Sequence, residues 1–201
     1  MQRFFLAFLL IFSFLSAVAA QTPMLLNQLE QSWERKARWE ERNDIDGRFK
    51  LLAPAVLTHK VDTVETSLGK QAYHTFFLQA PDKDEAENII YAISYVDYPD
   101  GTLHHDSLEL VDEFLTGTEE EAAIAVGGEV IYSSDKLISG FPARQWRIDY
   151  PSKGGTASAR TLAGVAGNRY YELKVFSLQA SGLNKSADKF FDSVRLFSKS
   201  P

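Results

Sequence analysis

The hydrophobic positions of residues 88–98 alternate along the chain as they do in a strand that is covered on both sides. Each face of the extended chain carries apolar side chains: Ile89, Tyr91, Ile93 and Tyr95 on one, and Ile90, Ala92, Val96 and Tyr98 on the other. Because both faces must be covered, the pattern places this strand in the middle of a layered structure. Pro99-Asp100-Gly101 then predicts a turn.

Shorter segments with strand patterns lie on both sides of this segment. The further predicted strands are 49–52, 61–66, 71–78, 129–139, 144–150, 156–166 and 169–178. Turn residues separate them, and Ser67–Lys70 and Gly167–Asn168 are typical of hairpin turns. Polar and apolar residues alternate in 144–150, which predicts one wet face. The last third of the chain is therefore expected to be an antiparallel meander.

Two segments repeat apolar residues at helical spacing. The first is expected to begin at a cap formed by Asp106 or Ser107, to bend or break at Gly117, and to end at Gly127-Gly128. The second predicts a closing helix near residues 187–194 that packs on the sheet. Their apolar stripes are Leu108, Val111, Phe114 and Leu115 in the first, and Ala187, Phe190, Phe191 and Val194 in the second.

Residues 1–20 have the layout of a secretory signal peptide. Arg3 supplies a basic start, residues 4–15 are almost all apolar, and Ala17–Ala20 are the small residues that a signal peptidase reads. The apolar run is shorter than the ~18 residues of a spanning helix. We therefore expect cleavage before Ala20 or Gln21, export to the periplasm or outside the cell, and no stable membrane insertion afterwards. A retained membrane anchor is the alternative.

Residues 21–46 are rich in charge and follow a different pattern. Leu25, Leu29 and Trp33 recur every four residues, and Glu34 and Arg38 have the spacing and order of a helical ion pair. This segment is expected to be a charged amphipathic helix or linker ahead of a single domain over residues 47–199. It either packs on that domain or docks a partner.

Composition and charge narrow the classes of function. With 45% apolar and 24% charged residues, the 201-residue chain can bury a core and is not globally disordered. It has no cysteine, which excludes disulfides, thiolate metal sites and cysteine nucleophiles. The formal net charge is −6, so no nucleic-acid partner is expected.

Several short segments of the sequence, taken in their order along the chain, resemble the PsbP-like family, whose fold is shared with the Ran-binding Mog proteins. These segments are Gly47–Lys50, Tyr95–Pro99, Gly140–Arg144, Asn168–Tyr171 and Phe190–Val194. The resemblance covers about residues 47–199 and is greatest to exported bacterial members. It implies an α+β fold in which an antiparallel β-sheet is flanked by helices, the PsbP-like α/β/α sandwich. The matching residues have the character of turns and core, so no functional residue follows from them.

The most tempting candidates for metal ligands are His104, His105 and Asp106, with Glu109 one helical turn further on. However, adjacent histidines on a loop rarely point at one ion, and the spacing differs from that of H-E-x-x-H. We expect a solvated loop that caps the helix, and no metal ion.

Patterns for catalysis are weak. There is no G-x-S-x-G elbow, and His59 and His74 have no recognisable serine partner. Residues 67–70 are not a phosphate-binding loop, because Val64 stands where the first glycine is required. The acidic residues of 82–87 indicate a solvated turn, and the sequon at Asn184 is better explained as a helix start. We expect no catalytic residue and no cofactor, and keep a metal-dependent or hydrolytic enzyme as an alternative.

These observations favour a small exported domain that acts by binding. We expect an accessory protein that assists a protein partner in the cell envelope or outside the cell. The alternative is a carrier that holds a small apolar ligand in a groove between sheet and helix. The residues proposed for this groove or partner surface are Leu25, Leu29, Trp33, Tyr98 and Trp146.

Overall fold

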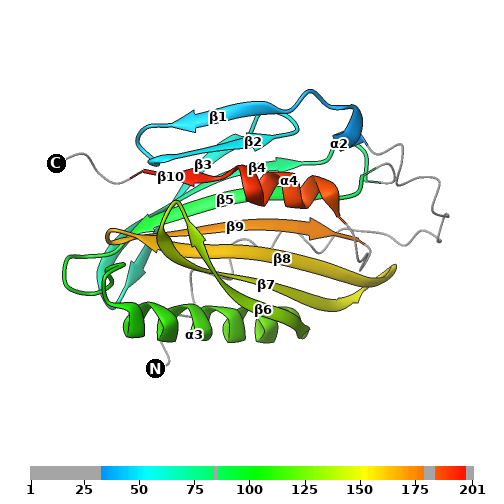
Figure 1. Cartoon of the computed structure of the whole chain (residues 1–201). Helices are drawn as coiled ribbons and strands as arrows, with labels where there is room; N and C mark the ends of the chain where they lie inside the picture. The colour runs from blue at the N-terminus through cyan, green and yellow to red at the C-terminus, as the bar shows by residue number, and fades with distance from the viewer. Residues whose placement is uncertain (1–32, 84–85, 179–183, 198–201) are drawn as a thin grey trace.

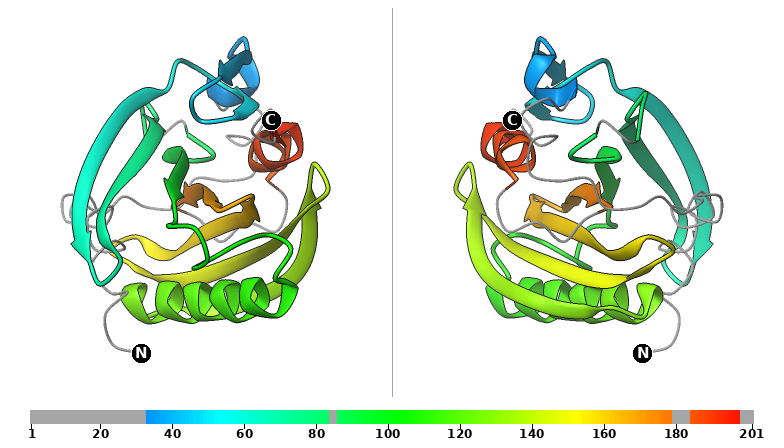
Figure 2. Two further views of the ribbon diagram at one scale, coloured as in Figure 1. Left: turned by 90° about the vertical axis from the view of Figure 1, so that its left-hand side faces the viewer. Right: turned by 90° about the vertical axis from the view of Figure 1, so that its right-hand side faces the viewer.

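A curved antiparallel sheet of seven strands forms the centre of the molecule (Figures 1 and 2). The structure is a computed structural model that describes residues 33–83, 86–178 and 184–197. The strands are ordered β3-β4-β5-β9-β8-β7-β6 across the sheet. Their bounds are β3 (Thr58–Thr66), β4 (Gly69–Gln79), β5 (Ile90–Asp97), β6 (Glu129–Ile138), β7 (Phe141–Ser152), β8 (Gly155–Ala166) and β9 (Arg169–Ser177).

The central position predicted for residues 88–98 is confirmed. Strand β5 pairs with β4 on one side and β9 on the other. Tyr91 and Ile93 face one core, while Val96 faces another on the opposite side of the sheet. The predicted hairpin turns are also present, and Gly69 and Gly167 have φ values of 93° and 67°, which glycine adopts without strain.

The inner side of the curved sheet is covered by the C-terminal helix and a small second sheet (Figure 2). Helix α4 (Lys185–Ser193) begins at Asn184, whose side chain accepts a hydrogen bond from the Ala187 N–H. The small sheet has the order β1 (Glu40–Asp44), β2 (Phe49–Ala53), β10 (Arg195–Leu196). The inner core between these layers includes Phe49, Phe76, Tyr91, Ile93, Tyr95, Tyr171, Leu173, Phe190 and Phe191.

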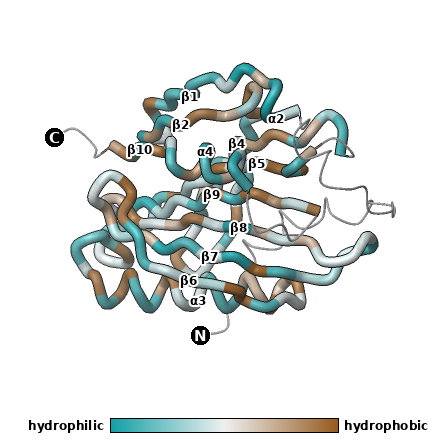
Figure 3. The backbone as a smooth tube through the Cα atoms, turned by 45° about the vertical axis from the view of Figure 1, so that its right-hand side comes forward, coloured by the Kyte–Doolittle hydropathy of each residue, from teal (hydrophilic) through white to brown (hydrophobic). Residues whose placement is uncertain are grey.

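Helix α3 (Leu108–Val126) lies against the outer side of the sheet, over β7 and β8 (Figure 2). Hydrophobic and hydrophilic residues are interspersed along it (Figure 3), and its buried residues Val111, Leu115 and Ala122 recur at intervals of four and seven, as on one face of a helix. The outer core beneath it includes Val96, Tyr98, Val111, Leu115, Trp146, Ile148 and Tyr170. With helices on both faces, the chain has the predicted α+β architecture of an antiparallel sheet flanked by helices.

Two expectations for α3 are wrong in detail, and a third holds only for the position of the cap. The helix runs without a break through Gly117. Ser107 occupies the N-cap position but its side chain makes no capping hydrogen bond, and Leu108 is 65% exposed although its spacing placed it on the buried stripe. A single glycine costs a helix only about 1 kcal/mol, which the packing of Val111 and Leu115 offsets.

The charged segment before residue 47 does not continue as a helix. Helix α2 covers only Trp33–Lys36, and residues 40–44 form strand β1, which pairs with β2 across the boundary placed at residue 47. Glu34 makes no ion pair with Arg38: it is fully buried, and its carboxylate accepts hydrogen bonds from the backbone N–H groups of Asn88 and Glu87 at 2.7 and 3.3 Å. These contacts fix this end of the segment to the domain.

No helix in the described part of the chain combines the length and the apolar character needed to cross a bilayer. The predicted leader, Leu25 and Leu29 lie outside the described residues.

Candidate functional site

The loop before α3 brings together three of the four residues proposed as weak metal ligands. One ligand atom each from His104, His105 and Asp106 lies within 4.8 Å of the other two, so the histidines do converge. His104 Nδ1 and His105 Nε2 are each 3.3 Å from a carboxylate oxygen of Asp106. Glu109, the fourth candidate, lies outside this group, on the exposed first turn of α3.

The hydrogen bonds of this loop explain why it makes a poor metal site. His105 Nδ1 accepts the backbone N–H of Gly167 at 3.1 Å, which leaves the proton of the neutral ring on Nε2. That nitrogen lies 3.3 Å from an Asp106 carboxylate oxygen and, since it carries the hydrogen, has no lone pair for a metal. A metal-bound histidine needs the opposite arrangement, with its far nitrogen donating to an acceptor. The His105 N–H also donates to the Gly167 carbonyl, so the cluster joins this loop to the β8–β9 turn.

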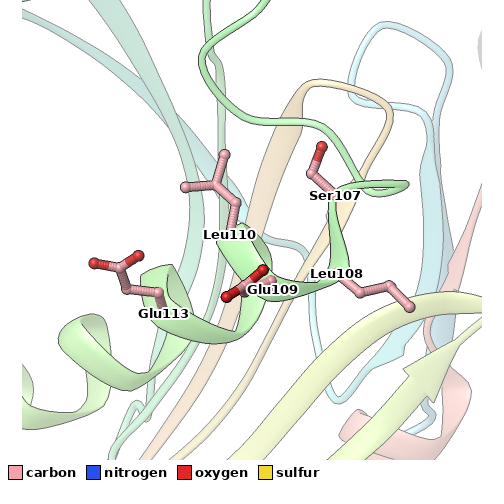
Figure 4. Close-up of a pocket in the computed structure, with 5 residues that line it drawn as sticks. All are labelled: Ser107, Leu108, Glu109, Leu110 and Glu113. Carbon is pink, nitrogen blue, oxygen red and sulfur yellow. The ribbon is translucent and has the colours of Figure 1, made fainter.

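A shallow hollow lies beside this loop, at the start of α3 (Figure 4). Its lining comes from one short segment, residues 107–113, and the side chains spread in different directions. Binding sites need polar groups that converge from several elements. The lining residues are Ser107, Leu108, Glu109, Leu110 and Glu113.

The residues proposed for a groove or partner surface fall on different sides of the sheet. Trp146 is fully buried and Tyr98 is 7% exposed, both in the outer core beside α3. Trp33 is partly buried against the inner core on the opposite face. The structure therefore does not bring Trp33 together with Tyr98 and Trp146.

A second cluster lies on the inner side of the sheet near its β3 edge. The ring cluster consists of His59, His74, Phe76 and Tyr95. His59 stacks on Phe76 at 4.1 Å with a 3° angle between the rings, and His74 stacks on Tyr95 at 4.5 Å and 8°. His59 Nε2 and His74 Nδ1 are 3.3 Å apart.

Strand register builds the ring cluster. The β3–β4 pairing places His59 opposite Phe76, and the β4–β5 pairing places His74 opposite Tyr95. His74 and Phe76 are two residues apart on β4, so their side chains share a face. The sequence alone indicates the two histidines only as possible partners of a serine and does not predict their proximity. The hairpin turn at residues 67–68 was the available signal, because it fixes this register.

Arg169 joins the ring cluster to the small sheet. Its guanidinium lies 4.2 Å from the centre of the Tyr95 ring. Nε and Nη2 donate to the Asp97 carboxylate at 2.7 and 2.6 Å, and Nη1 donates to the Asp46 carbonyl at 2.6 Å. The Tyr171 hydroxyl donates to the next carbonyl, that of Gly47, at 2.8 Å. Arg169 and Tyr171 thus hold the β1–β2 turn against the sheet.

Gly47 allows this close approach of the turn. A Cβ at this position would lie 2.6 Å from the Phe49 ring and 2.9 Å from Asp44 Oδ1. Any larger residue would therefore distort the turn and displace the Asp46 and Gly47 carbonyls that accept from Arg169 and Tyr171.

The surroundings of the ring cluster change the pKa values of His74, of Tyr95 and of the neighbouring Asp97. Burial lowers the pKa of His74, and the charges of His59 and Arg169 act in the same direction, whereas Asp97 and Asp44 oppose them. The hydrogen bonds from Arg169 lower the pKa of Asp97, and burial raises the pKa of Tyr95. His59 is exposed and His74 half-buried, so these imidazoles are the part of the cluster that solvent reaches.

Comparisons with known proteins identify the fold. No family model matches the sequence, and no curated protein matches it. A crystal structure from Bacteroides thetaiotaomicron aligns with a TM-score of 0.50 and 11% identity over 80% of this chain and 49% of that one, so this chain spans about half its length. The solution structure of cyanobacterial PsbP (CyanoP) from Synechocystis sp. PCC 6803 aligns with a TM-score of 0.50 and 9% identity, over 80% of this chain and 94% of that one. These likenesses show a PsbP-like fold, as the resemblance implied.

Proposed function

Since the chain has a PsbP-like fold, we propose that it is an exported accessory protein that binds a protein partner in the cell envelope or outside the cell and catalyses no reaction itself. The leader pattern of residues 1–20 supports export.

The observation that carries this proposal is that three of the gathered ionisable side chains, those of Arg169, His105 and Glu34, hold the fold together. Arg169 and His105 are each bonded to the backbone of a turn, and Glu34 accepts two backbone N–H groups. A catalytic acid or base must instead be free to exchange a proton with a substrate. In the described part of the chain these groups hold segments together, which suits a protein that presents a surface.

Strand β3 is the surface that fits a partner best. It is an outer strand of the sheet, and among the described strands it pairs only with β4. An unpaired strand edge offers a row of backbone donors and acceptors to an extended segment of another protein. Its pairing with β4 runs from Thr58 to Thr66 without interruption, whereas β6 at the other edge has a bulge between Val130 and Tyr132. A bulge twists an edge and hinders such pairing. We therefore place the partner on β3, beside the exposed His59.

Site-specific photo-crosslinking tests the proposal. A photoreactive residue replaces Val61 on β3, and a matched one replaces Leu137 on β6; both side chains are exposed, at 47% and 72%. In cells that make the full chain, we expect one crosslinked product from position 61 and none from position 137. The mass of the exported chain should correspond to a start at Ala20 or Gln21.

Two results would contradict this function. One is an uncleaved chain that stays inside the cell, which removes the export step. The other is an identical set of products from both positions, or no product at position 61, which removes β3 as the contact surface.

A carrier for a small apolar ligand is the alternative, and it makes a different prediction. Tyr98 and Trp146 are buried beside α3, so a ligand at these residues would require α3 to move. Native mass spectrometry of the purified chain should then show a bound apolar compound.

A further inference from the structure

We propose that His59 and His74 form a binding site for one divalent late transition-metal ion of the zinc type, at the β3 edge of the inner face. This site does not depend on the protein partner proposed above. Imidazole nitrogen is a preferred ligand of Zn²⁺, Cu²⁺ and Ni²⁺.

The separation of the two facing nitrogens suits such an ion. A tetrahedral zinc ion with Zn–N bonds of about 2.0–2.1 Å holds two nitrogens about 3.3–3.4 Å apart. His59 Nε2 and His74 Nδ1 are 3.3 Å apart. The ring centres are 5.4 Å apart with 18° between the planes, so the two imidazoles are nearly parallel. To meet at a single ion beside them, each lone pair must turn by about 35° from the line that joins the two nitrogens.

Binding of the ion requires one ring to change its tautomer, but neither neutral ring has to lose a proton. Without metal, one facing nitrogen carries the hydrogen that bonds the other ring. When the ion binds, this hydrogen moves to the other nitrogen of the same ring, as in metal-bound histidines generally. Both facing nitrogens then offer lone pairs. Because His59 is exposed, water can complete the coordination.

The ring planes are already held in place. Phe76 lies under His59, and Tyr95, buried at 4% exposure, lies under His74. All four residues lie on paired strands, which position ligands better than loops do. Little side-chain freedom is therefore lost on binding, which favours affinity.

The contrast with His104 and His105 supplies an internal control. In that loop, backbone N–H groups donate to His104 Nδ1 and His105 Nδ1. In the described part of the chain, no backbone N–H donates to either facing nitrogen of the His59–His74 pair, whose hydrogen-bond contact is with each other. The His59–His74 pair is thus the better metal site, although the His104–His105 loop has more types of ligand close together.

Zinc titration of matched variants tests the site. The chain is purified without a histidine tag, treated with a chelator and titrated with Zn²⁺ alone by calorimetry. The variants are His59→Asn, His74→Asn and the control double variant His104→Asn/His105→Asn. Circular dichroism melts check that each is folded, and NMR of the imidazole nitrogens reports the tautomers.

We expect one Zn²⁺ per parent chain at micromolar metal, and the same binding in the control double variant. His59→Asn and His74→Asn should each weaken the affinity by about tenfold or more. In NMR spectra the His59 and His74 signals should shift on adding Zn²⁺. His59 is exposed, so its substitution should leave the fold intact and give an interpretable result even if His74→Asn is destabilised.

Three results would each overturn the proposal: no binding by the parent at micromolar Zn²⁺, equal binding by all variants, or loss of binding only when His104 and His105 are replaced. Each leaves the proposed protein partner on β3 untouched, because crosslinking from position 61 tests that separately.

Discussion

Replacing Arg169 with methionine should destabilise the fold by detaching the β1–β2 turn. Methionine keeps an apolar stem of similar length and removes the guanidinium. The change therefore deletes the two hydrogen bonds to Asp97, the bond to the Asp46 carbonyl and the contact with the Tyr95 ring. Arg169 is only 7% exposed, so little water can replace it.

The size of the loss in stability depends on whether each former partner of Arg169 can bind water instead. The Asp97 side chain is 52% exposed, so water can solvate its carboxylate, and the full loss of about 3–5 kcal/mol for a broken buried ion pair does not apply. The Asp46 carbonyl loses a charged donor, which costs about 1–3 kcal/mol, and the stacked cation contributes about 0.5–2 kcal/mol. We expect a loss of about 3 kcal/mol in the free energy of unfolding.

Urea unfolding followed by tryptophan fluorescence measures this loss. For a domain of about 150–250 residues the melting temperature should fall by roughly 6–12 °C. Arg38→Met is the control, since Arg38 is exposed and should change stability by less than about 0.5 kcal/mol. In an Asp97→Asn background the loss from Arg169→Met should be smaller, because part of it is shared. A loss below about 1 kcal/mol, or an equal loss in both backgrounds, would refute the role assigned to Arg169.

Four further outcomes follow from buried groups and glycines, each measured by chemical or thermal unfolding. Phe190→Ala should cost about 3–5 kcal/mol, because the side chain is fully buried; unfolding like the parent would show that it is not. Gly117→Ala should stabilise α3 by about 0.5–1 kcal/mol, since nothing lies within 4 Å of the added Cβ, and a loss would contradict a regular helix there. Gly128→Ala should instead destabilise, because its Cβ would lie 2.6 Å from Ile148 Cγ2 and 2.7 Å from the Asp149 carbonyl; full parental stability would show that this contact relaxes freely. Folding lowers the pKa of Asp97, so its stabilisation is present above the unfolded value of about 4 and is lost as pH falls through the folded value. Asp97→Asn should therefore flatten the acid side of the stability profile, and an unchanged slope would count against the Arg169 pairing.

The pattern of apolar residues predicted the parts of the fold in which burial decides the structure. Strand β5 and helix α4 bury apolar side chains at regular spacing, and both were expected from the sequence. The pattern failed at residues 40–44, which are charged and polar throughout. They form β1 because their backbone pairs with β2, and a backbone partner leaves no trace in side-chain spacing.

The candidate site was less predictable for a related reason. His59 and His74 are fifteen positions apart, and only the pairing of β3 with β4 brings their rings together. The reverse holds at His104 and His105, which are adjacent in the sequence. There the deciding feature is the hydrogen bond from Gly167, more than sixty residues away. Ligand type can be read from a sequence, but the lone pair that remains free depends on the folded surroundings.

The difference between the two outer strands limits how copies of this domain can aggregate. A sheet with a regular, unpaired strand at both edges can polymerise edge to edge into a fibre, because each added copy offers another free edge. Here β3 has an uninterrupted register, while β6 is bulged. Association through β3 would use up the regular edge of both copies and stop at a pair.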